Sequence, residues 1–141
     1  MAAVPELESQ AIVFVLDGRE VEALPSETIL QAARRHGGEI PHLCYKDGLR
    51  PDGNCRVCVV EITGERPLAP SCCRTPSAGM QVSTTSERVR HSQKMVLELL
   101  LSAVVETAYT RDSELDVWAH SSSSLNKKLN HIFLKPCKKS N

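Results

Sequence analysis

The feature that most constrains this chain is a set of four cysteines with the spacing C-x10-C-x2-C-x13-C. They are Cys44, Cys55, Cys58 and Cys72. Four thiolates can bind one tetrahedral metal ion or an iron–sulfur cluster. Proline and glycine interrupt any helical or strand period over residues 39–54, so this stretch is predicted to be a long loop. The chain is therefore predicted to fold around a metal-binding loop.

The residues alone leave three kinds of site open. A structural zinc site usually pairs two CxxC knuckles, but here Cys72 stands next to Cys73, and adjacent cysteines do not easily chelate one ion together. A thioredoxin-like redox pair lies at the start of a helix, whereas strand-like residues follow Cys58. A cluster needs backbone amides near its sulfides, and a loop with glycines can turn its amides inward. An iron–sulfur cluster is favoured, with zinc as the main alternative.

Hydrophobic patterning outlines a small α+β domain. An apolar run over 11–16 ends at Asp17-Gly18, a dipeptide typical of two-residue hairpins, and 19–24 is predicted as the return strand. Ser26 is expected to cap a short helix that stops at Gly37-Gly38. After the loop, further strands are predicted at 57–63, 67–71 and 79–83.

An amphipathic helix is predicted from about residue 86 to 104. Thr84 and Glu87 form a capping-box pattern. The apolar residues at helical spacing are Val89, Val96, Leu97, Leu100, Leu101 and Val104. This face covers either the same domain or a docked partner. The expected organisation is a flexible segment at 1–10, the core domain at 11–85, a helical extension at 86–119 and a polar, disordered tail at 120–141.

Composition excludes several classes of function. The 17 Lys and Arg balance 17 Asp and Glu, so no basic surface for nucleic acid is expected. The longest apolar run, 95–105, is broken by Glu98 and Ser102 and is shorter than the roughly 20 residues that a membrane span requires. The first ten residues lack the features of a signal peptide. A cytoplasmic location is expected, where six cysteines are more typical of metal binding than of disulfides.

Three segments together resemble a known family. They are IPHLCY at 40–45, GNCRVCVVEI at 53–62 and LAPSC at 68–72, followed by Gly79-Met80. They resemble the N-terminal [2Fe-2S] domain shared by the large subunit of respiratory complex I, the iron-only and NAD-linked hydrogenases, and the NAD-dependent formate dehydrogenases. The resemblance implies a β-grasp ferredoxin-like fold and a [2Fe-2S] cluster ligated by Cys44, Cys55, Cys58 and Cys72. Cys73 is the rival of Cys72, and the spacing from Cys58 favours Cys72.

Two later segments, 91–102 and 110–118, look most similar to the formate dehydrogenase alpha subunit. This resemblance implies an electron carrier that is not catalytic alone. Its partners would be other subunits of an NAD-linked redox complex, namely a flavin- and NAD-binding diaphorase and a catalytic subunit. Two alternatives are a zinc-stapled adaptor module and a truncated fragment of the larger subunit with no independent role.

The remaining candidate residues have simpler interpretations. His42 lies two residues before Cys44, but a Rieske-type centre needs two histidines on one iron, and four cysteines are already available. Cys137 is expected to be a free thiol in the tail. Surface positions are expected for His36, His91, His120 and His131, and a wet strand face for Glu20 and Glu22.

Overall fold

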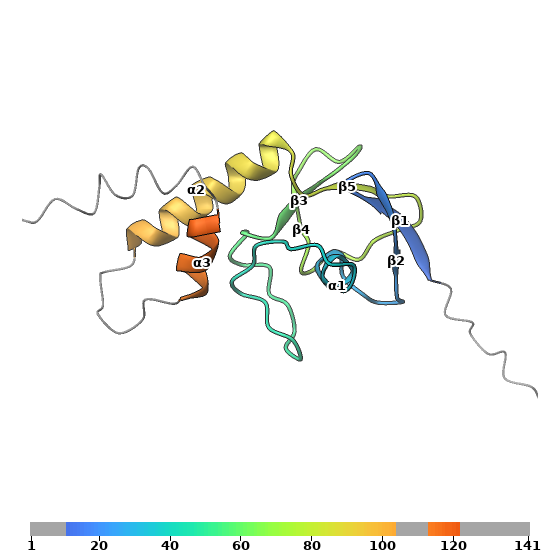
Figure 1. The fold of residues 1–141 in the computed structure, drawn as a ribbon, viewed down its shortest axis with the longest axis horizontal. Coiled ribbons are helices and arrows are strands. Elements are labelled where there is room, and N and C mark those ends of the chain that lie inside the picture. Colours follow the sequence, from blue (N-terminus) through green and yellow to red (C-terminus); the bar gives the residue numbers. More distant parts are fainter. Residues whose placement is uncertain (1–10, 104–112, 122–141) are drawn as a thin grey trace, which may run out of the picture.

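The structure, a computed structural model, describes residues 11–103 and 113–121. The segment predicted at 1–10, position 104 of the predicted helix, and almost all of the tail predicted at 120–141 lie outside the described residues. Figure 1 shows the elements, which follow one another in this order: β1 (Ile12–Leu16), β2 (Arg19–Ala23), α1 (Ile29–Arg35), β3 (Val59–Ile62), β4 (Ala69–Pro70), β5 (Gln81–Ser83), α2 (Glu87–Ala103) and α3 (Glu114–Ser121).

The five strands form one mixed sheet with the order β2-β1-β5-β3-β4. β5 is parallel to β1 on one side and antiparallel to β3 on the other, while β1 and β2 form an antiparallel hairpin and β3 pairs antiparallel with β4. α1 buries its apolar side chains in the same core as the sheet. This is the β-grasp arrangement, so the predicted α+β, ferredoxin-like fold is confirmed.

The hairpin turn between β1 and β2 has the predicted two-residue form. Leu16 pairs with Arg19, and Asp17 and Gly18 between them adopt φ values of 49° and 82°. Two consecutive positive φ values are those of a type I′ turn, which aspartate and glycine tolerate. The backbone conformation at this turn was therefore readable from the dipeptide alone.

Both predicted helix caps are wrong by a few residues. α1 is capped by Thr28, not Ser26: the Thr28 hydroxyl accepts from the Gln31 amide at 3.3 Å, and the Gln31 side chain accepts from the Thr28 amide at 2.9 Å. Ser26 instead has a φ of 68° in the preceding turn. A reciprocal capping box satisfies two otherwise unpaired amides, which a lone serine cannot do.

Thr84 also has a different role from the one predicted. Its amide and hydroxyl donate to the two carboxylate oxygens of Asp17 at 2.7 and 2.6 Å, so it ties the hairpin turn to the segment before α2. The residue that caps α2 is Ser86, whose hydroxyl accepts from the Val89 amide at 3.3 Å. The pattern of Thr84 and Glu87 matched a capping box, but Thr84 instead hydrogen-bonds to Asp17, which is 67 residues away in the sequence.

The apolar face of α2 covers the same domain. Val89 and Leu97 are fully buried. The Gln93 side chain donates to the Val59 carbonyl at 3.3 Å, and Arg88 forms an ion pair with Glu61 at 2.6 Å. These contacts fix α2 along β3, the strand that follows the CxxC pair.

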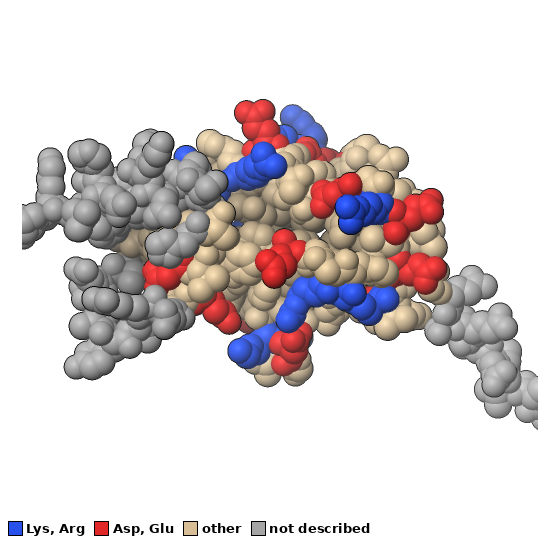
Figure 2. Space-filling model, in the orientation of Figure 1, with Lys and Arg blue, Asp and Glu red and all other residues tan. Residues whose placement is uncertain are grey.

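Charged side chains are mixed over the surface. On the face seen in Figure 2, acidic and basic residues are interspersed. The ion pairs of the described residues are Arg34 with Asp47, Arg35 with Glu27, Arg74 with Glu65, and Arg88 with Glu61. Over residues 11–103 and 113–121, no helix is both long and apolar enough to cross a membrane.

Candidate metal centre

The long loop that carries Cys44 is fastened to α1 by a chain of polar contacts. The Gln31 amide group donates to the Tyr45 hydroxyl at 2.9 Å, and that hydroxyl donates to Asp47 at 3.0 Å. Arg34 forms an ion pair with the same carboxylate at 3.1 Å. Burial of the Tyr45 ring raises the pKa of its hydroxyl, which keeps it a hydrogen-bond donor. The backbone next to Cys44 is therefore held in place by the helix.

Cys58 and Cys72 are brought together by the pairing of β3 with β4. In this antiparallel register Val59 lies opposite Pro70. Just beyond the pair, the amide and hydroxyl of Ser71 both donate to the Cys58 carbonyl, at 3.0 and 2.7 Å. Both cysteines are fully buried. Two cysteines that are 14 positions apart in the sequence thus become neighbours in the core.

The Cys72 thiol lies in a buried environment close to other cysteines. Burial raises the pKa of the Cys72 thiol, and the neighbouring thiols of Cys58 and Cys73 raise it further. The sulfur atoms of Cys72 and Cys73 are 3.6 Å apart. A buried thiolate is stable only beside a positive charge. The buried thiols of Cys58 and Cys72 can therefore lose their protons when a metal ion binds them.

The other two predicted ligands are less buried. Cys44 and Cys55 are both of intermediate exposure, and Cys55 packs against an apolar cluster that includes Val57 and Leu97. Next to Cys55 the backbone adopts positive φ at Gly53 (64°) and at Arg56 (58°). A Cβ atom on Gly53 would come within 2.9 Å of the Cys73 sulfur, so the loop approaches this cysteine closely and glycine is required.

The donor set fits a binuclear cluster. Within the described ranges, no three histidine, cysteine or carboxylate side chains lie close enough together to hold a metal ion. By its chemistry, a [2Fe-2S] cluster takes four cysteine ligands, two for each iron. The structure offers one buried pair, Cys58 and Cys72, and two partly exposed thiols on the loop. The assignment of all four as ligands stays a prediction.

The structure describes some of the other candidate residues and leaves others outside its described ranges. Cys73 is exposed, and Cys137 lies outside the described residues. His42 uses its Nδ1 to donate to the Ile40 carbonyl at 2.8 Å, and His36 has its Nε2 3.0 Å from the Glu22 carbonyl. His91 is exposed as expected. The side chain of His120 and all of His131 lie outside what the structure describes.

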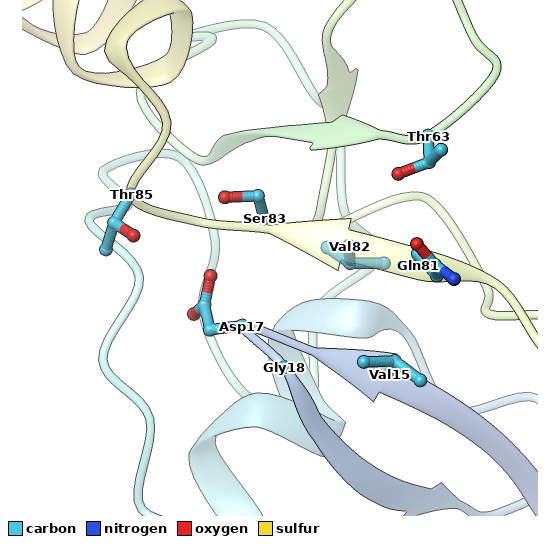
Figure 3. A pocket seen from close by; sticks show the side chains of 8 residues that line it. All are labelled: Val15, Asp17, Gly18, Thr63, Gln81, Val82, Ser83 and Thr85. Carbon is cyan, nitrogen blue, oxygen red and sulfur yellow. The ribbon is translucent and has the colours of Figure 1, made fainter.

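A pocket lined by both polar and apolar residues lies at the other end of β3, beyond Ile62. Figure 3 shows that Asp17 is the charged side chain in it, and both oxygens of that carboxylate are bound by Thr84. The pocket is lined by Val15, Asp17, Gly18, Thr63, Gln81, Val82, Ser83 and Thr85. None of these residues is a predicted metal ligand, so the pocket is separate from the cysteine site.

A β-grasp sheet with two cysteines on its long loop and two more in the adjoining strand region defines an iron–sulfur domain of the ferredoxin class. Residues 9–87 match the family described as the 2Fe-2S iron-sulfur cluster binding domain. The chain belongs to this family, and its cofactor is a [2Fe-2S] cluster.

The similar proteins are subunits of larger redox enzymes. The chain is 39% identical over 90 residues to an NADH-quinone oxidoreductase subunit of Rickettsia prowazekii, an alignment that covers 64% of this chain and 13% of the relative. It is 42% identical over 96 residues to the NADP-reducing hydrogenase subunit HndD of Solidesulfovibrio fructosivorans, covering 64% and 16%. The crystal structure of an NAD+-reducing [NiFe]-hydrogenase in the H2-reduced state superposes with a TM-score of 0.73 at 30% identity, covering 81% of this chain and 50% of that one. The chain thus matches only a small part of its curated relatives.

Replacing Arg56 by glycine is expected to stabilise the protein by about 0.5–1 kcal/mol. A left-handed φ costs a non-glycine residue about 1–2 kcal/mol, and part of this gain is lost to the greater freedom of glycine in the unfolded chain. Anaerobic urea unfolding of the cluster-loaded protein measures the difference. Arg50→Gly is the matched control, since Arg50 is exposed in the same loop without a positive φ, and it should lower stability. Equal effects of the two substitutions would contradict the assignment of strain to Arg56.

Proposed function

We propose that this chain transfers one electron at a time through a [2Fe-2S] cluster held by Cys44, Cys55, Cys58 and Cys72. The observation that carries the proposal is the fully buried pair Cys58 and Cys72, whose segments the β3–β4 pairing brings together, in a chain of the [2Fe-2S] family. The cluster, when bound, supplies the one-electron chemistry, with a potential on the order of −400 mV if it behaves as plant-type centres do.

The residues of the chain act by holding and orienting the ligands. Ser71 fastens the Cys72 segment to the Cys58 carbonyl with two hydrogen bonds, and Tyr45 fastens the Cys44 segment to α1. The positive φ values at Gly53 and Arg56 turn the backbone sharply on both sides of Cys55. Such turns can direct amides toward a bound anion, and amides near cluster sulfides tune the potential.

The proposal extends to the complex in which the electron moves. Relatives named as subunits of NADH-quinone oxidoreductases and hydrogenases support a place in a multi-subunit redox complex. We propose that its partners there are a flavin- and NAD-binding diaphorase subunit and a catalytic subunit, and that the complex is cytoplasmic. Within that class we propose NAD-dependent formate dehydrogenase as the enzyme served. This finer choice is supported by the resemblance of residues 91–102 and 110–118, of which 110–112 lie outside the described residues.

Low-temperature EPR of the anaerobically purified protein tests the function. A spin-one-half signal that appears only after dithionite reduction, with equal amounts of iron and acid-labile sulfide, is expected for a [2Fe-2S] carrier. Silence in both states, together with zinc and no sulfide, would replace the carrier by a zinc-stapled module. Association with partner subunits in the source cells, and formate-dependent NAD reduction by the isolated complex, would test the finer choice.

A further inference from the structure

The short helix α3 packs against the cysteine loop. Trp118 and Leu115 of α3 contact an apolar cluster around the buried residues Val57 and Leu97. The same cluster includes Cys55 and Leu43, the neighbour of Cys44. In Figure 1, α3 lies beside α2 at the side of the loop. A helix that begins more than 40 residues after the fourth cysteine therefore contacts the predicted site.

Aromatic contacts bring Trp118 to the Cys44 side of the loop. The ring of His42 lies 5.8 Å from the ring of Trp118 and 5.9 Å, edge-on, from that of Tyr45. Tyr45 directly follows Cys44 and is buried. Trp118 is half-buried, so one part of its ring contacts the loop while another part remains toward solvent.

The four predicted ligands differ in exposure, and the Trp118 contact lies next to the more exposed ones. Cys58 and Cys72 are fully buried by the β-grasp core, whereas Cys44 and Cys55 are only partly buried. The partly buried pair is the one whose segments touch Trp118, through His42 on one side and the Val57 cluster on the other. The two predicted ligands that remain partly exposed are therefore on the side of the loop against which α3 packs.

We propose that the Trp118 side chain shields the Cys44 and Cys55 side of the [2Fe-2S] cluster from water. The inference rests on the proposed function, because it needs a cluster in the loop. Reduction adds negative charge to the cluster, and water stabilises that charge, so excluding water lowers the potential. The same cover limits the access of dissolved oxygen to the cluster.

Comparison of three variants of the cluster-loaded chain tests the proposal. Trp118→Ala should shift the EPR-monitored midpoint potential to a more positive value and bleach several-fold faster in air. Trp118→Phe, which keeps an aromatic ring, should remain close to wild type. Val117→Ala is the matched control, because Val117 is the adjacent residue of α3 and is 57% exposed, and it should change neither quantity.

A wild-type potential and bleaching rate in Trp118→Ala would overturn the proposal. If Trp118→Ala does not retain its cluster, the midpoint potential of Leu115→Ala tests the proposal instead, because this is a smaller truncation in the same apolar contact. There the shift in potential should be accompanied by a red shift in the fluorescence of Trp118, the single tryptophan of the chain; an unshifted potential with red-shifted fluorescence would also overturn it. Absence of any reducible EPR signal in the wild type would instead count against the proposed function itself.

Discussion

Serine in place of Cys44, Cys55, Cys58 or Cys72 is expected to abolish or greatly weaken the visible chromophore and the reduced-state EPR signal of the [2Fe-2S] cluster. Each of these residues is predicted to supply one of four thiolates, and a hydroxyl is a much poorer ligand for iron than a thiolate. The loss should be most severe at Cys58 and Cys72, which are fully buried, since an unligated polar group there also destabilises the core. Iron and sulfide content of anaerobically purified variants is the measurement.

Cys73→Ser is the matched control for these four variants. Cys73 is exposed, and its sulfur lies 3.6 Å from that of Cys72, so it is the nearest available thiol to a predicted ligand. Its replacement should leave colour and EPR signal intact. A colourless Cys73→Ser protein beside a coloured Cys72→Ser protein would reverse the assignment of the fourth ligand.

Leu97→Ala is expected to lower the free energy of unfolding by about 2–5 kcal/mol, the usual cost of truncating a buried leucine. Leu97 is 0% exposed and packs against Val57, one of the two residues between Cys55 and Cys58. The cavity would therefore open directly behind the CxxC segment, and the cluster should also be lost at a lower urea concentration than in the wild type. Anaerobic urea unfolding followed by circular dichroism and by cluster absorbance measures both effects.

Leu99→Ala provides the comparison on the same helix. Leu99 is 71% exposed, so its truncation should change the free energy of unfolding by less than about 0.5 kcal/mol. Equal destabilisation by the two substitutions would show that α2 is not docked through the Leu97 face.

Local patterns were sufficient to predict most of the fold. The Asp17-Gly18 dipeptide was enough to predict the turn, because the turn needs positive φ at only these two positions and both residue types tolerate it. The apolar spacing predicted a helix at about 86–104, and the structure describes α2 over Glu87–Ala103, because its residues Val89, Gln93 and Leu97 are buried on one face. The caps failed for a different reason. Thr28 and Ser86 took the positions that were expected of Ser26 and Thr84, since the choice among nearby polar residues depends on which other groups compete for them.

The site was only partly predictable. The spacing of the cysteines indicated a metal-binding loop, but the pairing of the Cys58 and Cys72 segments follows from the register of β3 and β4. The contact of Trp118 with the loop had no signal in the sequence, because it joins segments about 60 to 75 residues apart through side chains of ordinary apolar character. The closest signal was the amphipathic pattern of α2, which predicted that its apolar face packs against another surface.

The strand order has a consequence for how the protein is made. β5, which is the last strand among the described residues, lies in the middle of the sheet, and within these residues β1 and β3 are joined only through it. Until residues 81–83 have left the ribosome, the hairpin of β1 and β2 and the pair β3 and β4 cannot form one sheet. All four predicted ligands precede β5, so a nascent chain exposes the complete set of thiols before the domain can close around them.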